Sequence, residues 1–188
     1  MKTNGKSTQS IDKFYAQFTN STTDSSKIIL LNSAKNRLKE RMINRDAPDF
    51  IFLDVNGRQV HSRKFKDKII VLDFWASWCP PCIQGLKALE ETRKKYENDS
   101  SIVFLLLNVE KEMAPALKII NGKANKSMYG FDTNAASKFQ VNGLPSTIFI
   151  DNHGKIRFQA IGLKTFNLQE QENEMEAMIE LIKEFSNE

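Results

Sequence analysis

The sequence contains little cysteine and little histidine, and both shortages exclude kinds of site. Its two cysteines, Cys79 and Cys82, are three residues apart, so none is left for a structural disulfide framework. A zinc ion held by this pair would need two further ligands, and His61 and His153 stand far away without zinc-site spacing. We therefore expect no metal site, and thiol–disulfide exchange by the two cysteines would need no organic cofactor.

Long apolar runs are also missing. No stretch approaches the roughly 20 apolar residues that a membrane span needs. The first six residues, MKTNGK, are not followed by the apolar core of a signal peptide. We expect either a cytosolic protein or the trimmed, mature part of an exported one, without a membrane span.

Composition and charge are those of a globular protein. The 188 residues, 40% hydrophobic and 27% charged, suit one domain with an appendage. The net charge is +4, but lysine and arginine do not form a dense block interleaved with aromatic residues. Nucleic-acid binding is therefore not expected.

The segment from Trp78 to Cys82, WCPPC, carries the chemistry. It follows an apolar run over residues 69–75 and precedes a helical pattern that extends to about Tyr96. Residues three apart on a helix lie close enough for a disulfide. At a helix start the positive end of the dipole favours a thiolate, so we assign Cys79 as the nucleophile and Cys82 as the resolving thiol. An inert or metal-bound pair is the alternative.

Two prolines stand between the cysteines. Pro80 and Pro81 lack N–H groups that could otherwise point at the sulfur atoms, which influences how oxidising the pair is. Dithiols of this kind span about −120 to −270 mV, so the direction of electron flow stays open at this point.

The remaining pattern predicts an α/β fold. A hairpin is expected around Asn56-Gly57, and two buried strands over 69–75 and 102–107 flank a helix in a right-handed crossover. That helix is predicted to turn Ile83, Leu86, Leu89 and Tyr96 inward. Further predicted elements are a helix near 115–120, a helix opened by Asp132, a second hairpin over 147–161 and a last helix that starts at Asn167.

The first 46 residues differ from the rest. They are polar, with one apolar patch at helical spacing (Ile11, Phe14, Tyr15 and Phe18) and a candidate helix over residues 27–43. Pro48 marks a boundary. We expect a helical or partly disordered N-terminal extension over 1–46 and a main domain over 47–188. The extension either packs on the main domain or serves as a docking or dimerising element.

WCPPC after an apolar strand, with Gly143-Leu144-Pro145-Ser146-Thr147 before a later strand, resembles the thioredoxin superfamily, and most of all its TlpA-like branch. The resemblance covers about Ala47 to the C-terminus. It implies a thioredoxin-like fold with a central mixed sheet, an N-terminal hairpin and flanking helices. It also implies a thiol:disulfide oxidoreductase of the bacterial periplasm or cell envelope, with a cytoplasmic location as the alternative. Its partners would be protein thiols and disulfides, together with an upstream dithiol electron donor.

The resemblance also assigns roles to single residues. Pro145 would be a cis proline facing the disulfide, and the backbone of Leu144 would pair with the substrate chain; an ordinary trans turn is the alternative. Asp73, a costly carboxyl in an apolar strand, would move the proton of Cys82, or else would only satisfy local hydrogen bonds. Trp78 would provide apolar contact surface, as would Pro80 and Pro81.

Some features depart from the resembling family, and two rival functions stay open. Gly85 and Lys87 replace a glutamate and a helix-kinking proline that many envelope members have, and Leu106 stands where thioredoxins place a lysine. Glu110 is a weaker candidate for proton or substrate contacts than for a solvated strand end. The rivals are a binding module with an incidental CxxC and a peroxiredoxin-like peroxidase.

Overall fold

The computed structural model describes residues 11–13, 15–16, 25, 32, 35–36, 42–123, 125, 128–162 and 167–185. They contain an eight-stranded mixed sheet with the order β1-β8-β7-β4-β5-β6-β2-β3. The strands are β1 (Met42–Asp46), β2 (Ile51–Asp54), β3 (Gln59–His61), β4 (Ile69–Trp75), β5 (Ile102–Asn108), β6 (Tyr129–Asp132), β7 (Ser146–Ile150) and β8 (Lys155–Ile161). The helices are η1 (Ser62–Phe65), α3 (Pro80–Lys95), α4 (Met113–Ile120), α5 (Ala135–Lys138) and α6 (Leu168–Phe185).

Strand β4 is the centre of the sheet. All seven of its residues are buried, as expected for a strand that is apolar on both faces. It pairs in parallel with β5 and antiparallel with β7. The predicted hairpins are confirmed, β2 with β3 and β7 with β8.

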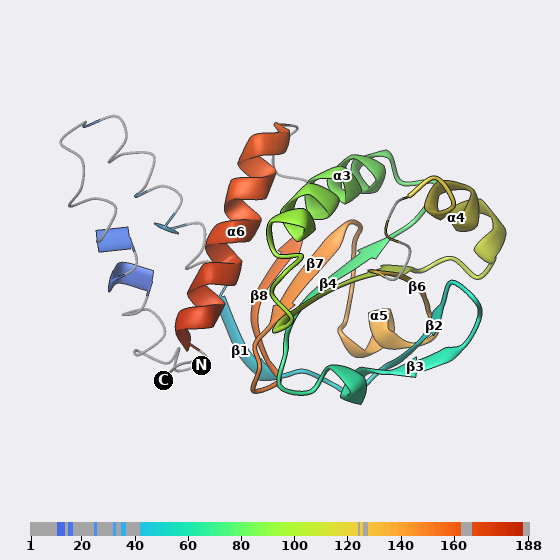
Figure 1. Cartoon of the computed structure of the whole chain (residues 1–188), viewed down its shortest axis with the longest axis horizontal. Helices are drawn as coiled ribbons and strands as arrows, with labels where there is room; N and C mark the ends of the chain where they lie inside the picture. Colours follow the sequence, from blue (N-terminus) through green and yellow to red (C-terminus); the bar gives the residue numbers. More distant parts are fainter. Residues whose placement is uncertain are drawn as a thin grey trace.

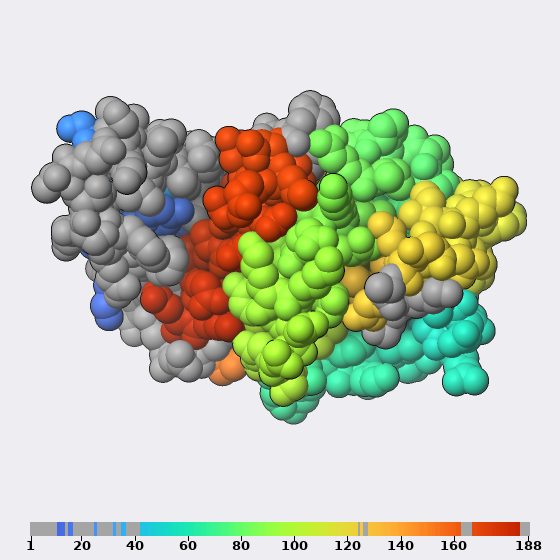
Figure 2. All heavy atoms as spheres, turned by 45° about the horizontal axis from the view of Figure 1, so that its top comes forward, coloured from blue at the N-terminus to red at the C-terminus, as the bar shows by residue number. Residues whose placement is uncertain are grey.

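Helices cover both faces of the sheet (Figure 1). Helices α3 and α6 lie side by side on one face, and the short α5 lies on the other. Figure 2 shows α3 in green against α6 in orange-red. Ion pairs join the two helices from Lys95 to Glu172 and Glu176, and the Tyr96 hydroxyl donates to Glu180. The sheet therefore separates two apolar cores, and the α3 side contains both cysteines.

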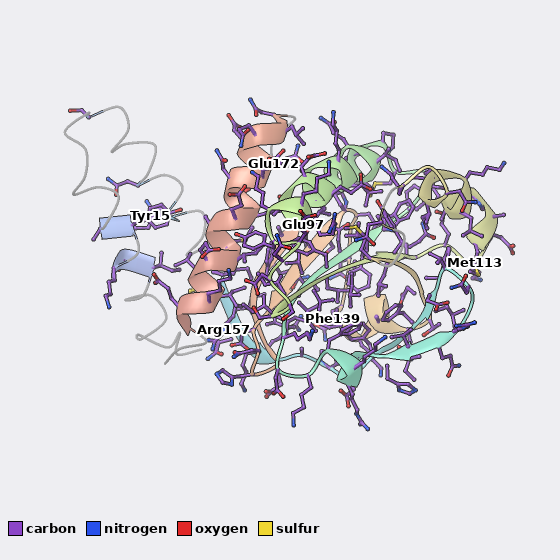
Figure 3. All side chains as sticks on the ribbon, viewed as in Figure 1. Tyr15, Glu97, Met113, Phe139, Arg157 and Glu172 are labelled. Atoms are coloured by element: carbon purple, nitrogen blue, oxygen red, sulfur yellow. A yellow bond between two sulfur atoms is a disulfide. The ribbon has the colours of Figure 1, made fainter. Side chains whose placement is uncertain are left out.

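The structure adds one strand to the predicted elements and shows how two of the predicted helices begin. Strand β6 was not predicted, and it precedes the predicted helix at α5, where Asp132 accepts the N–H groups of Asn134 and Ala135. Phe139 reaches the core on the α5 side, as predicted (Figure 3). Asn167 accepts the N–H of Glu170 at the start of α6.

The helix predicted over residues 27–43 is wrong at its end, because Met42 and Ile43 belong to β1. This strand pairs antiparallel with β8, where Arg45 lies opposite Ile156. Met42 packs on the α3-side core and Ile43 on the opposite core, which is the alternation of a strand. The edge of β8 offers backbone N–H and C=O groups to this segment, and a helix prediction from the local sequence takes no account of them.

Little of the predicted extension lies within the described residues. Ile11 and Tyr15 are buried in helical backbone and belong to the α3-side core, which also contains Met175 and Met178 of α6. Tyr15 is labelled beyond α6 in Figure 3. Phe14, Phe18 and most of residues 27–41 lie outside the described residues, so the docking alternative and the division at residue 46 stay predictions.

Candidate active site

The two cysteines lie at the junction between β4 and α3. The chain leaves β4 at Trp75, and the N–H of Cys79 donates to the carbonyl of Ala76 over 3.2 Å. Cys79 is the N-cap of α3, and Cys82 is in its first turn. Their sulfur atoms form a disulfide, with Cα atoms 5.2 Å apart. The predicted strand-to-helix placement of the pair is therefore confirmed.

The two cysteines differ in exposure and in their hydrogen bonds. Cys79 is 5% exposed and Cys82 is 1% exposed, so an external thiol meets Cys79 first. The backbone N–H of Cys82 donates to Sγ of Cys79 over 3.3 Å. Pro80 and Pro81 occupy the first two helical positions and offer no N–H. This arrangement fits an attacking Cys79 and a resolving Cys82.

Pro145 lies at the same end of the sheet as the disulfide. The Leu144–Pro145 peptide bond is cis, and β7 begins at the next residue. Ser146 pairs with Phe74, so the antiparallel register continues Pro145 toward Trp75, four residues before Cys79. The carbonyl of Pro145 accepts the N–H of Gly162, which follows β8. Pro145 is buried and Leu144 is half-buried.

Asp73 is a buried carboxyl beneath α3. It is 2% exposed and accepts the Thr147 hydroxyl over 2.6 Å. Val71 and Trp75, two positions to either side, belong to the same core as Cys82, so Asp73 points to the face that α3 covers. Burial raises the pKa of Asp73 to about 7, against the opposing effect of the Thr147 hydrogen bond. This carboxyl can gain or lose a proton near neutral pH.

Exposed apolar side chains lie next to the cysteines and beside Pro145. Within the described residues, the exposed large hydrophobic side chains are Trp78, Ile83 and Ile161. Trp78 precedes Cys79 and is 68% exposed. Ile161 pairs with Ser146 beside Pro145. Ile83 was predicted to point inward, and that prediction is wrong, because it lies on the outer side of the first turn of α3.

Trp75 lies in the core, and Glu110 contacts the turn that leads to Cys79. Trp75 is fully buried and packs edge-on against Tyr129, so it belongs to the core and not to the contact surface. Glu110 is not a solvated strand end, because its carboxylate accepts the backbone N–H of Ser77 over 2.6 Å and the Ser77 hydroxyl over 2.8 Å. The parallel pairing of β4 with β5 was the signal that could have revealed this contact.

Hydrogen bonds keep Glu110 ionised. Burial opposes the charged form, but donors from the Ser77 backbone, the Asn108 amide and the Ser77 hydroxyl together lower the pKa of Glu110.

Among the described residues, no group of three or more His, Cys, Asp or Glu side chains could hold a metal ion.

The sequence is similar to a known protein family and to known thiol-disulfide oxidoreductases. A family model described as Redoxin matches residues 42–179, which is most of the chain. A thiol-disulfide oxidoreductase, ResA, of Bacillus thuringiensis is 28% identical over 130 residues, covering 68% of this chain and 75% of the relative. The thioredoxin-like protein YneN of Bacillus subtilis is 27% identical over 138 residues, covering 70% and 79%.

Solved structures support the same fold. A structure from Chlorobium tepidum, named as a thiol:disulfide interchange protein DsbE, has a TM-score of 0.64 at 24% identity and covers 74% of this chain and 96% of its own. A thiol-disulfide oxidoreductase from Bacteroides fragilis has a TM-score of 0.58 at 20% identity, covering 70% and 99%. Taken with the disulfide at the start of α3, these matches show that the chain belongs to the Redoxin family, as a ResA-like member of the thioredoxin superfamily.

Proposed function

We propose that this thiol-disulfide oxidoreductase works as a reductant of disulfides in other proteins. The observation that supports this most is the exposed apolar side chain of Trp78 next to a disulfide whose first cysteine, Cys79, is the more exposed of the two. Apolar patches on a monomer's surface commonly mark sites for other proteins. A small-molecule site would instead require a concave pocket around the sulfurs.

The reaction proceeds by two exchanges. The Cys79 thiolate attacks one sulfur of the substrate disulfide, so that a Cys79–substrate bond forms, the substrate's own S–S bond breaks, and one substrate thiolate leaves and takes a proton from water. The Cys82 thiolate then attacks Sγ of Cys79. The Cys79–Cys82 disulfide forms, the mixed disulfide breaks, and the second substrate thiolate leaves. Two electrons have passed to the substrate, and an upstream dithiol donor restores the reduced pair by the reverse exchanges.

Asp73 serves as the base for the second exchange. Cys82 must lose a proton before it attacks, and it is 1% exposed, so water reaches it poorly. A carboxyl on the same face of the sheet, with a pKa of about 7, takes up such a proton at neutral pH. Thr147 holds one carboxyl oxygen in place by its hydrogen bond.

Trp78, Pro80, Pro81 and Leu144 form the substrate-binding surface. Trp78 and Pro80 are exposed beside Cys79, and their apolar surfaces would pack on side chains that flank the substrate cysteine. The backbone of Leu144, followed by cis Pro145, would pair with the substrate chain as a short added strand.

We place this activity in the bacterial periplasm or cell envelope, with the cytoplasm as the alternative. Support comes from similarity to ResA and to the DsbE-named structure, and from the resemblance to envelope thiol:disulfide oxidoreductases. No helix among the described elements is long and apolar enough to span a bilayer. Fractionation of the source cells with an antibody to the protein tests this location.

Insulin reduction in the presence of dithiothreitol tests the function. The protein should accelerate precipitation of the insulin B chain, and Cys79→Ser should abolish the acceleration. A binding module with an incidental CxxC gives only the background rate, and that result would refute the proposal. A peroxide consumption assay on the same samples identifies a peroxidase.

A further inference from the structure

Residues at the end of β5 are hydrogen-bonded to the turn that leads to Cys79. Glu110 lies two residues after β5 and accepts two hydrogen bonds from Ser77, one from its backbone N–H and one from its hydroxyl. Neither the disulfide exchange nor the proton transfer described above uses this carboxylate. Its role therefore has to be sought in the turn that it holds.

Buried groups fix the carboxylate itself. The side-chain amide of Asn108 donates to Oε2 of Glu110 over 2.8 Å, and the N–H of Glu110 donates back to Oδ1 of Asn108 over 3.0 Å. Asn108 is fully buried. The N–H of Val109 donates to the carbonyl of Trp75 over 3.0 Å. The turn is thus tied to β5 on both sides of Ala76.

The carboxylate also brings a negative charge close to the nucleophile. The Cα atoms of Ser77 and Cys79 are at most about 7.6 Å apart, because two peptide units separate them. Because the carboxylate is bound to Ser77, it lies on the order of 10 Å from the sulfur of Cys79. Its negative charge opposes ionisation of the thiol by roughly half a pKa unit where solvent screens the pair to an effective dielectric constant of about 50. It acts against the helix start, which favours the thiolate.

We infer that Glu110 is a positioning residue for Cys79: its carboxylate fixes the Ser77 turn, and its charge limits the stability of the Cys79 thiolate and keeps the pair reducing. The role in catalysis rests on the proposed function, whereas the effect on the thiolate does not. Asp73 on β4 and Tyr129 on β6, which is hydrogen-bonded to Glu90 of α3, are further titratable groups on the sheet face beneath α3. These groups remain unchanged in the Glu110 and Glu112 variants that test the inference.

The charge is tested with Glu110→Gln and a matched control, Glu112→Gln. Glu112 is exposed two residues along, and its side chain caps nothing. The rate of alkylation of the reduced proteins by iodoacetamide, followed against pH, gives the pKa of Cys79. We expect Glu110→Gln to lower this pKa by about half a unit. At a pH above that pKa, the equilibrium constant with glutathione should shift about threefold toward the dithiol. The reduction potential of the pair then becomes about 15 mV less negative. Glu112→Gln should match the parent.

The grip on the turn is tested with Glu110→Asp, which keeps the charge but is too short to hold both Ser77 donors. We expect a parent-like pKa of Cys79 and a several-fold slower reaction of the reduced protein with oxidised glutathione. A parent-like pKa in folded Glu110→Gln overturns the inference about charge. An unchanged rate in Glu110→Asp overturns the inference about position, and this measurement decides the case if Glu110→Gln does not fold. If the parent does not reduce insulin, the proposed function is refuted. The inference about Glu110 would still stand on the glutathione measurements, which need no protein substrate.

Discussion

The backbone N–H of Cys82 donates to Sγ of Cys79 over 3.3 Å. An N-cap side chain normally accepts from the second or third helical position, and here the second position is Pro81, which has no N–H. One backbone donor in the first turn therefore reaches the nucleophile. A thiolate with few donors is less stable, and a less stable thiolate makes a dithiol more reducing.

Restoring the missing donor should make the pair more oxidising. In Pro81→Ala, the new N–H at the second helical position can reach Sγ of Cys79, so the pKa of Cys79 should fall. We expect a change in the glutathione equilibrium on the order of tenfold, or about 30 mV. Pro80→Ala is the matched control, because the N–H of the first helical position does not reach the N-cap side chain. Equal shifts in both variants would contradict this account of the first turn.

Removal of the resolving thiol should trap substrates. In Cys82→Ser, the mixed disulfide formed by Cys79 cannot be resolved, so reduced variant incubated with a cell extract should accumulate covalent complexes. These complexes should disappear on gels run with dithiothreitol. Cys79→Ser leaves only the buried Cys82 and should trap almost nothing. Equal trapping by both variants would contradict our assignment of the two cysteines.

Asp73 should make stability depend on pH. Its pKa rises from 3.8 to about 7 on folding, so the protonated form is favoured in the native state. That contribution is complete below pH 3.8 and is lost as the pH rises through 7. Asp73→Asn should therefore gain stability over the oxidised parent between pH 5 and pH 8, by at most about 4 kcal/mol.

Urea unfolding at the two pH values measures this gain, and the exposed Asp67→Asn is the control for loss of one charge. Asp73→Asn should also slow release of substrate from the mixed disulfide near neutral pH, because Cys82 loses its base. A gain that does not grow with pH would contradict a buried, shifted carboxyl.

Trp78 should matter for protein substrates and not for folding. Its side chain is 68% exposed, so Trp78→Ala should change the free energy of unfolding by less than about 0.5 kcal/mol. Loss of its contact area should lower kcat/KM for insulin by roughly tenfold, if one aromatic contact contributes about 1.4 kcal/mol. Reaction with oxidised glutathione, which offers little surface to Trp78, should stay near the parental rate. A parallel loss with both substrates would show that Trp78 acts on Cys79 itself.

Much of the fold could be predicted because its signals are local. The apolar run before WCPPC has the length and composition of a strand buried on both faces. Asn56-Gly57 marked the hairpin of β2 with β3 without reference to the rest of the chain. The disulfide site was predictable for the same reason, since strand, turn and helix follow one another in the sequence. Strand β1 was missed because its conformation depends on the edge of β8, which lies more than 100 residues away.

The parts of the site that could not be predicted depend on register. Ile161 comes to Pro145 through the pairing of β7 with β8, and Glu110 comes to Ser77 through the parallel pairing of β4 with β5. Ile83 has the residue type of a core position, yet it faces outward because Cys82 and Leu86 already occupy the inward face of this turn of α3.

The equilibrium of the Cys79–Cys82 pair with glutathione tests the central claim most directly. A reductant whose nucleophile receives one amide hydrogen bond and lies near an ionised Glu110 should have a reduction potential nearer to about −270 mV than to −120 mV. Oxidised protein is incubated with glutathione buffers of known ratio, and the dithiol fraction is read after alkylation. A potential near −120 mV, the range of a strong oxidant, would contradict the account.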